Sequence, residues 1–213
     1  MIPSRILGVD PGLRVSGYVL LAGDSVEASG VLPNEEILAS VLPCACDPGA
    51  LLAIEEMGGQ GRFVGLDELR TVRWSGRFEE RWIALCAYRG CPAGVRFVLR
   101  STVKARILGR ANGKDAQIRQ ALIDLWGGEE AALGPKGQKK RKGVEPIRGP
   151  LYGVSSHAWS ALAVAVTVRD QFAQEAAPAP QAPGEGTPAR GVSTSAPRNA
   201  PTATQGGAEG VRP

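Results

Sequence analysis

The sequence predicts one α/β domain built on a mixed β-sheet, and three observations support this fold class. The chain has 213 residues and is 43% hydrophobic, which is enough for one globular core. Its first part reads as consecutive strands, and its middle part alternates strand-like with helical segments before a closing helix. The predicted strands cover residues 6–10, 15–22, 26–32, 51–56 and 96–99.

Two of these strands share an unusual ending. Segment 6–10, Ile-Leu-Gly-Val-Asp, is a short apolar run that ends in a carboxylate and is followed by the turn signal Pro11-Gly12. Segment 51–56, Leu-Leu-Ala-Ile-Glu-Glu, has the same form and is broken by glycines. Both patterns are typical of buried central strands, whereas residues 15–22 and 26–32, joined by a turn at 22–25, complete an initial meander.

Helices are expected where apolar residues recur at helical spacing. Asn34 is a candidate cap for a short helix ending near residue 42, and Ser155-Ser156 are candidate caps for a final helix that ends near Phe172. A Gly/Pro-rich basic loop is expected over about 127–152. The other predicted helices cover about 65–88, 101–108 and 114–126.

The end of the chain differs in composition from the rest. Residues 173–213 are mostly Ala, Pro, Gly, Ser and Thr and contain no aromatic residue. Such a segment buries too little apolar surface to offset the entropy of ordering, so we predict one globular domain over 1–172 and a disordered tail over 173–213. We find no signal peptide and no apolar run that would span a membrane, and therefore expect a cytoplasmic protein.

The basic residues are concentrated in the predicted loop. The net charge is only +4, which by itself says little about partners. A run such as this is either a solvated loop or an arm that contacts phosphates, and the sequence leaves both readings open. The residues concerned are Lys136, Lys139, Lys140, Arg141 and Lys142.

The four cysteines admit a zinc site, but their spacing favours another interpretation. Cys44 and Cys46 are two positions apart, and Cys86 and Cys91 are five apart, so neither pair has the CxxC spacing of zinc motifs. We expect reduced, structural cysteines.

Three residues are candidates for chemistry. Asp10 and Glu55 each end a predicted buried strand, where a carboxylate is costly unless it is paired or metal-bound. If the strands are neighbours, the two carboxylates form a hard oxygen site that suits Mg²⁺ or Mn²⁺; otherwise both simply reach solvent. His157, the only histidine, lies in the first turn of the last helix, where the helix dipole disfavours the imidazolium and leaves a neutral ligand or base. Ser160 follows on the same helix face.

These motifs together resemble RuvC-type Holliday junction resolvases of the ribonuclease-H-like superfamily, particularly phage-borne members. The opening strand with Asp-Pro-Gly and Ser16-Gly17-Tyr18, the acidic strand Ala53-Ile54-Glu55-Glu56, and the basic segment 103–109 occur in the family's order. The closing segment 157–165, His-Ala-Trp-Ser-Ala-Leu-Ala-Val-Ala, resembles the family's last motif. The resemblance covers roughly residues 5–172.

The resemblance implies an endodeoxyribonuclease with two Mg²⁺ or Mn²⁺ ions per active site. Asp10, Glu55 and His157 match the first three ligand positions, and the fourth, usually Asp, is Ser160, which is a weaker ligand. Lys104 matches a family lysine that acts at the junction, and Lys114 lies beside the position of a second.

The implied substrate is branched DNA, in particular a four-way junction cut by a homodimer during recombination and repair. Arg62 and Phe63, on the glycine-rich loop, are candidates for stacking into separated base pairs, and the basic run for contacting the backbone. The resemblance places the dimer interface near the helix predicted at 65–88.

Three alternatives remain. An actin-like phosphotransferase shares the fold, but it needs two such domains, and the chain has no G-x-x-x-x-G-K-[ST] loop. A catalytically weak or inactive protein that binds branched DNA is supported by Ser160. A nuclease with broader branched-DNA specificity is equally compatible with the residues.

Overall fold

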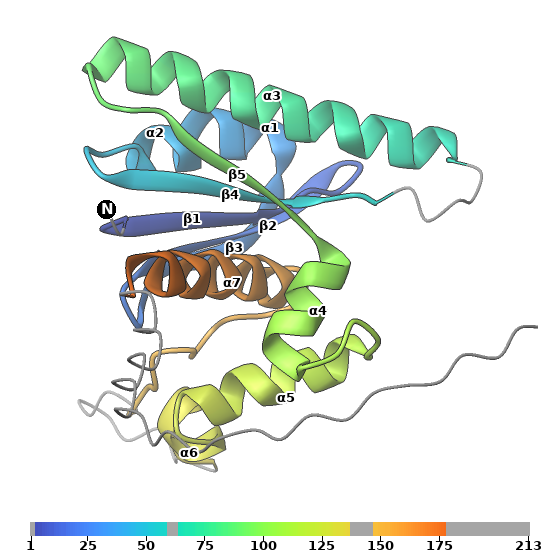
Figure 1. Cartoon of the computed structure of the whole chain (residues 1–213), viewed down its shortest axis with the longest axis vertical. Coiled ribbons are helices and arrows are strands. Elements are labelled where there is room, and N and C mark those ends of the chain that lie inside the picture. Colours follow the sequence, from blue (N-terminus) through green and yellow to red (C-terminus); the bar gives the residue numbers. More distant parts are fainter. Residues whose placement is uncertain (1–2, 59–63, 137–146, 178–213) are drawn as a thin grey trace, which may run out of the picture. The chain divides into compact units, whose positions relative to one another are not determined.

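The computed structural model describes residues 3–58, 64–136 and 147–177. These residues form one compact unit around a five-stranded sheet with strand order β3-β2-β1-β4-β5 (Figure 1). The mixed α/β fold predicted from the sequence is confirmed. The strands are β1 (Arg5–Asp10), β2 (Val15–Ala22), β3 (Ser25–Pro33), β4 (Ala50–Glu56) and β5 (Gly94–Leu99).

Strand direction follows from the length of each connection. β1, β2 and β3 are antiparallel neighbours joined by short turns, which is the predicted meander. β4 and β5 are reached through helical crossovers and run parallel to β1 and to each other. The two apolar runs that end in carboxylates are therefore β1 and β4, which are adjacent in the centre of the sheet.

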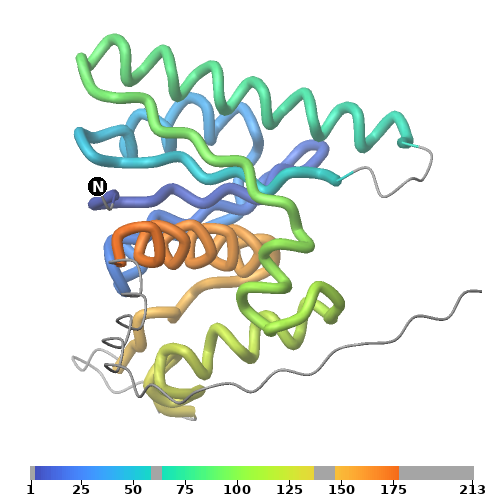
Figure 2. Tube along the Cα trace, in the orientation of Figure 1, coloured from blue at the N-terminus to red at the C-terminus, as the bar shows by residue number. Residues whose placement is uncertain are grey.

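Helices cover both faces of the sheet. Figure 1 shows α1, α2 and α3 on one face and α7 on the other, with α4, α5 and α6 beyond α7, and the Cα trace in Figure 2 shows α3 running along the whole sheet. The helical segments are α1 (Asn34–Glu36), the π-helical turn η1 (Ile37–Val41), α2 (Leu42–Ala45), α3 (Leu66–Arg89), α4 (Arg100–Leu108), α5 (Asp115–Leu125), α6 (Glu129–Leu133) and α7 (Ala158–Ala176).

Each face has its own apolar core, as expected for a sheet that is buried on both sides. Under α3 lie alternate residues of β1 and β4, and Phe78 and Trp82 of α3 itself are fully buried against them. Under α7 lie the other alternate strand residues, with apolar residues of α4 and α5. Since α7 is buried over most of its length, it is the central helix of the second core.

Three local predictions need correction. The helix at Asn34 continues through a π turn to Ala45, and its cap residue is Pro33, because the Asn34 side chain is used elsewhere. A short helix, α6, occupies part of the predicted basic loop. The final helix ends at Ala176, one turn beyond Phe172, because Ala173, Gln174 and Glu175 are good helix formers.

The prediction that Ser155 or Ser156 caps the final helix with its side chain is also wrong. The start of α7 has no side-chain cap hydrogen bond within the described part of the chain. Instead, the N–H of Ala158 donates to the carbonyl of Ser155 at 2.9 Å and the N–H of Trp159 donates to that of Ser156 at 3.2 Å. Positions 178–213, most of the predicted disordered tail, lie outside the described residues. No helix among the described residues is long and apolar enough to span a membrane.

Candidate active site

Asp10 and Glu55 lie side by side at the end of the two central strands. Val9 pairs with Ile54 in the parallel β1–β4 ladder, and the same register sets Asp10 opposite Glu55. Both follow the alternation of Ile6, Gly8 and Ala53, so both point to the α7 face. Asp10 is 15% exposed and Glu55 only 9% exposed in their side chains. The sequence prediction that the two carboxylates meet is consistent with this geometry.

Two glycines bring α7 close enough to complete the site. A Cβ on Gly8 of β1 would lie 2.2 Å from the carbonyl oxygen of Ala161, and one on Gly17 of β2 would lie 2.3 Å from the carbonyl oxygen of His157. Only glycine permits such a close backbone approach. Gly17 therefore seats the first turn of α7 directly against the sheet.

This seating places His157 over Asp10. The His157 Nδ1 atom lies 3.1 Å from Asp10 Oδ2, although the two residues are 147 positions apart. The side chain of His157 is 58% exposed, so this residue lies at the surface above the two carboxylates. The residue before it, Ser156, has a φ of 47°, a left-handed conformation that costs a non-glycine residue about 1–2 kcal/mol. The backbone thus turns sharply just before the histidine.

A buried polar cluster holds the turn that follows Asp10, and sequence analysis missed it. Asn34 Nδ2 donates to the carbonyl of Gly12 at 2.9 Å, and the N–H of Gly12 donates to Ser16 Oγ at 3.1 Å. The Ser16 hydroxyl donates to Asn34 Oδ1 at 2.6 Å. Ser16 and Asn34 are both fully buried. Ser16 belongs to the quoted motif, but nothing in the sequence links it to Asn34.

Arg100 is the second residue that sequence analysis missed. It begins α4 directly after β5, and its guanidinium donates to Glu55 at 2.6 Å and to Asp115 at 2.7 Å. Asp115 is exposed at the start of α5, whereas Glu55 is buried. The sequence did hold one signal for this contact: Arg100 directly follows β5, a strand parallel to β4. The C-terminal ends of parallel strands lie at the same edge of the sheet, which brings Arg100 near Glu55.

The electrostatics of the site reflect two buried carboxyl groups in contact. Burial raises the pKa of Asp10, and hydrogen bonding and the positive charge of His157 and Arg100 oppose this rise. Burial also raises the pKa of Glu55, and the negative charge of Asp10 raises it further, against the opposing effect of Arg100. Burial therefore disfavours the charged form of both acids, and the negative charge of Asp10 disfavours it further at Glu55, so a cation bound between them would be favourable.

The remaining predicted residues lie around this centre. Ser160 lies in the first turn of α7, half-buried, three positions after His157. Lys104 is half-buried on α4, one turn after Arg100 and on the same helix face. Lys114 is exposed and caps α5, where its backbone N–H donates to Gln117 Oε1 at 3.0 Å.

Most of the predicted DNA-contact residues lie outside the described residues: Arg62, Phe63, Lys139, Lys140, Arg141 and Lys142. Lys136 is described, and its ammonium lies 2.7 Å from Glu129 Oε2 on the surface. Exposed pairs of this kind contribute little to stability, so the pair leaves Lys136 able to contact another anion.

The donor set fits a hard divalent cation. Two adjacent carboxylates supply the hard oxygen ligands that suit Mg²⁺ or Mn²⁺, and the imidazole of His157 is a further candidate ligand. Among the described residues, Asp10, Glu55 and His157 do not form as compact a ligand group as three cysteines elsewhere in the fold, whose sulfur atoms lie within 4.8 Å of one another.

The comparisons with known proteins concern the fold. The sequence matches no protein-family model, and a search among curated proteins gives no match. Among solved structures, the chain is similar to RuvC of Thermus thermophilus, with a TM-score of 0.52 and 18% identity over 79% of this chain and 96% of that one. It is also similar to T. thermophilus RuvC in complex with a Holliday junction substrate, with a TM-score of 0.50 and 18% identity over 77% and 92% of the two chains. At this identity the likeness shows that the chain has a RuvC-type, ribonuclease-H-like fold.

Proposed function

We propose that this chain, which has the fold of RuvC, is a metal-dependent endodeoxyribonuclease that cuts branched DNA and resolves four-way junctions. One observation carries the proposal. Asp10 and Glu55, on adjacent parallel strands, have side chains that are only 15% and 9% exposed, and His157 at the start of α7 contacts Asp10 at 3.1 Å. Burying two carboxyl groups next to each other is unfavourable for stability, so their placement here favours a functional role over a structural one.

Asp10, Glu55 and His157 would hold the metal ions, with Ser160 as a neutral fourth group. Bound Mg²⁺ or Mn²⁺ supplies an activated water and stabilises the oxyanion that leaves. The imidazole of His157 is oriented by Asp10 through Nδ1, so its second nitrogen would serve one of two roles, either as a metal ligand or as the acceptor of a proton from water. Lys104, half-buried one turn from Arg100, contributes positive charge beside the phosphate.

Arg100 has a different role in this proposal. Its guanidinium compensates Glu55 and is itself held by exposed Asp115. Because a guanidinium and a divalent cation compete for the same carboxylate, a metal ion held by Glu55 would weaken the Arg100–Glu55 pair and leave Arg100 paired with Asp115. Arg100 then lies at the edge of the site as a candidate phosphate contact.

The test is cleavage of a labelled four-way junction and of a linear duplex of the same sequence, in Mg²⁺, Mn²⁺ or EDTA. Wild-type protein should make paired nicks in the junction only with metal, and Asp10→Asn and His157→Ala should abolish them. Asp67→Asn is the matched control, because Asp67 is an exposed carboxylate on α3 that pairs with Arg70 and lies on a different element from Asp10 and Glu55. Metal-independent nicks, or nicks that survive Asp10→Asn, would contradict the proposal.

A second candidate function is supported by Ser160. A hydroxyl in place of a carboxylate weakens metal binding, so the chain would bind junctions without cutting them efficiently. Junction binding without nicks in either metal would favour this reading. Equal cutting of duplex and junction would instead favour the nuclease of broader specificity.

We also propose a homodimer, and the outer face of α3 supports it. Leu66, Leu69, Val72 and Ile83 are all between 46% and 63% exposed on this helix. Monomeric proteins rarely expose so many large apolar side chains on one element, and a symmetric dimer would bury them. The molar mass in solution tests this, with Leu69→Glu as the variant expected to dissociate the dimer.

A further inference from the structure

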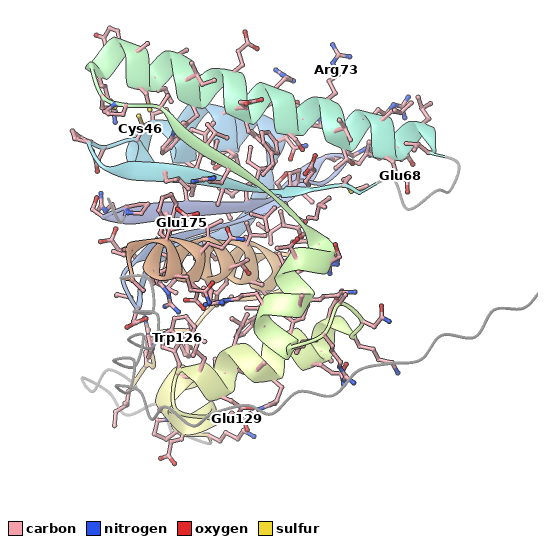
Figure 3. The ribbon with its side chains drawn as sticks, in the orientation of Figure 1. Cys46, Glu68, Arg73, Trp126, Glu129 and Glu175 are labelled. Carbon is pink, nitrogen blue, oxygen red and sulfur yellow. The ribbon has the colours of Figure 1, made fainter. Side chains whose placement is uncertain are left out.

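A second possible metal site lies at the other end of the sheet, in a cluster of thiols that the proposed nuclease chemistry does not use. The Sγ atoms of Cys46, Cys86 and Cys91 all lie within 4.8 Å of one another. Cys46 and Cys86 are fully buried, and their sulfur atoms are 3.4 Å apart. Figure 3 shows Cys46 beside the C-terminal end of α3. Sequence spacing did not indicate this grouping, because Cys46 lies at the end of α2, whereas Cys86 and Cys91 lie at the end of α3.

Two local structures bring the thiols together. The residue after α3 is Gly90, which has a φ of 66°. The N–H of Gly90 donates to the carbonyl of Ala87 at 3.2 Å, and the N–H of Cys91 donates to the carbonyl of Cys86 at 3.0 Å. This pair of bonds is a Schellman motif, which sets the side chains of Cys86 and Cys91 against each other. Cys46 ends α2, where its N–H donates to the carbonyl of Leu42, and completes the cluster from the opposite side.

The geometry suits a tetrahedral thiophilic ion better than a disulfide. Zinc–sulfur bonds of about 2.3 Å place the sulfur atoms of a tetrahedral site about 3.8 Å apart, which lies between the 3.4 Å and 4.8 Å found here. A disulfide requires about 2.05 Å, so Cys46 and Cys86 would have to move together.

The surroundings carry charge of the required sign. Arg89 donates a hydrogen bond to the backbone carbonyl of Cys46, so a guanidinium lies beside the thiols. Three thiolates around a divalent ion leave one negative charge, which this arginine offsets. Cys91 is half-exposed, so a fourth coordination position is accessible to water.

We propose that Cys46, Cys86 and Cys91 bind one Zn²⁺ ion that joins the end of α2 to the C-terminal end of α3. Thiolate ligands select zinc over the hard cations expected at the carboxylates. The two sites are independent, since Ala50 and Glu55 at opposite ends of β4 are already separated by roughly 17 Å at about 3.3 Å per residue. The zinc would stabilise the fold and take no part in DNA cleavage.

The experiment uses the full chain purified with a phosphine reductant and titrated with Co²⁺, whose bonds to thiolates give a charge-transfer band in the near ultraviolet. Wild-type protein should show this band at one Co²⁺ per chain, and Zn²⁺ should displace it. The band should disappear in Cys86→Ala and in Cys91→Ser, the latter being the half-exposed position where substitution disturbs packing least.

Two controls make the result specific. Cys44→Ala should keep the band, because Cys44 is exposed and lines a separate apolar pocket with Tyr18 and Leu20. Asp10→Asn should keep it as well, which separates this site from the nuclease centre and makes the two proposals fail independently. Zn²⁺ should raise the melting temperature of wild-type protein but not that of Cys91→Ser.

Three outcomes would overturn the proposal. No thiolate band in the fully reduced wild-type protein would mean that the thiols are inert core residues. A band that survives Cys86→Ala or is lost in Cys44→Ala would assign other ligands. Loss of two titratable thiols in air, without any metal band, would identify a disulfide pair instead.

Discussion

The substitution Gly17→Ala tests whether the close packing of α7 on β2 positions His157 for the proposed cleavage. The new Cβ would lie 2.3 Å from the carbonyl oxygen of His157 and 2.8 Å from the nitrogen of Ala158. Both are backbone atoms, so rotation of a side chain cannot relieve the clash. Ordinary contact begins near 3.4 Å, so α7 must move by about 1 Å, and a displacement of this size at a catalytic group lowers the rate on the order of 100-fold.

The assay is single-turnover cleavage of the junction, together with junction affinity and thermal unfolding. We expect Gly17→Ala to cut on the order of 100-fold more slowly, equivalent to about 2.7 kcal/mol in the barrier, with junction affinity little changed. Overpacking should also lower stability by about 1–3 kcal/mol. Gly76→Ala is the matched control, because nothing lies within 4 Å of its new Cβ and alanine favours the helix. A folded Gly17→Ala protein that cuts at the wild-type rate would refute the reasoning.

The other predictions concern the charges of the site. In EDTA at neutral pH, Asp10→Asn should melt at a higher temperature than the wild type. The pKa values of Asp10 and Glu55 are raised in the folded state. The wild-type protein therefore loses stability as the pH rises through these two pKa values, because the folded state holds its protons more tightly than the unfolded state. Melting curves at acid and neutral pH measure this effect. A difference in melting temperature between variant and wild type that does not widen toward neutral pH would contradict the prediction. Arg100→Gln should lower the melting temperature in EDTA and lower the Mn²⁺ concentration needed for half-maximal stabilisation, because Glu55 loses its competing cation; an unchanged Mn²⁺ midpoint would show that the two do not compete. Ser160→Asp should increase the cleavage rate at low Mn²⁺ by adding a charged ligand, and a slower variant would place Ser160 outside the metal site.

Much of the fold could be predicted from local sequence. The central strands β1 and β4 were visible as apolar runs, and α3 was visible from its helical spacing, because each pattern depends on neighbours within a few residues. The pairing of Asp10 with Glu55 was a reasonable inference, since parallel strands end at one edge of a sheet. The helix ends were less predictable: the cap of α7 uses backbone carbonyls, and Asn34 bonds to Gly12 instead of capping its helix.

The sequence alone determined which segments form strands and helices and which carboxylates end buried strands, because backbone periodicity and burial are local properties. Tertiary structure decided which distant side chains meet. The contact of Arg100 with Glu55, the seating of His157 against Gly17, and the grouping of Cys46 with Cys86 each depend on strand register and helix packing. Those are set by the fit of whole elements against a common core, and no spacing along the chain encodes them directly.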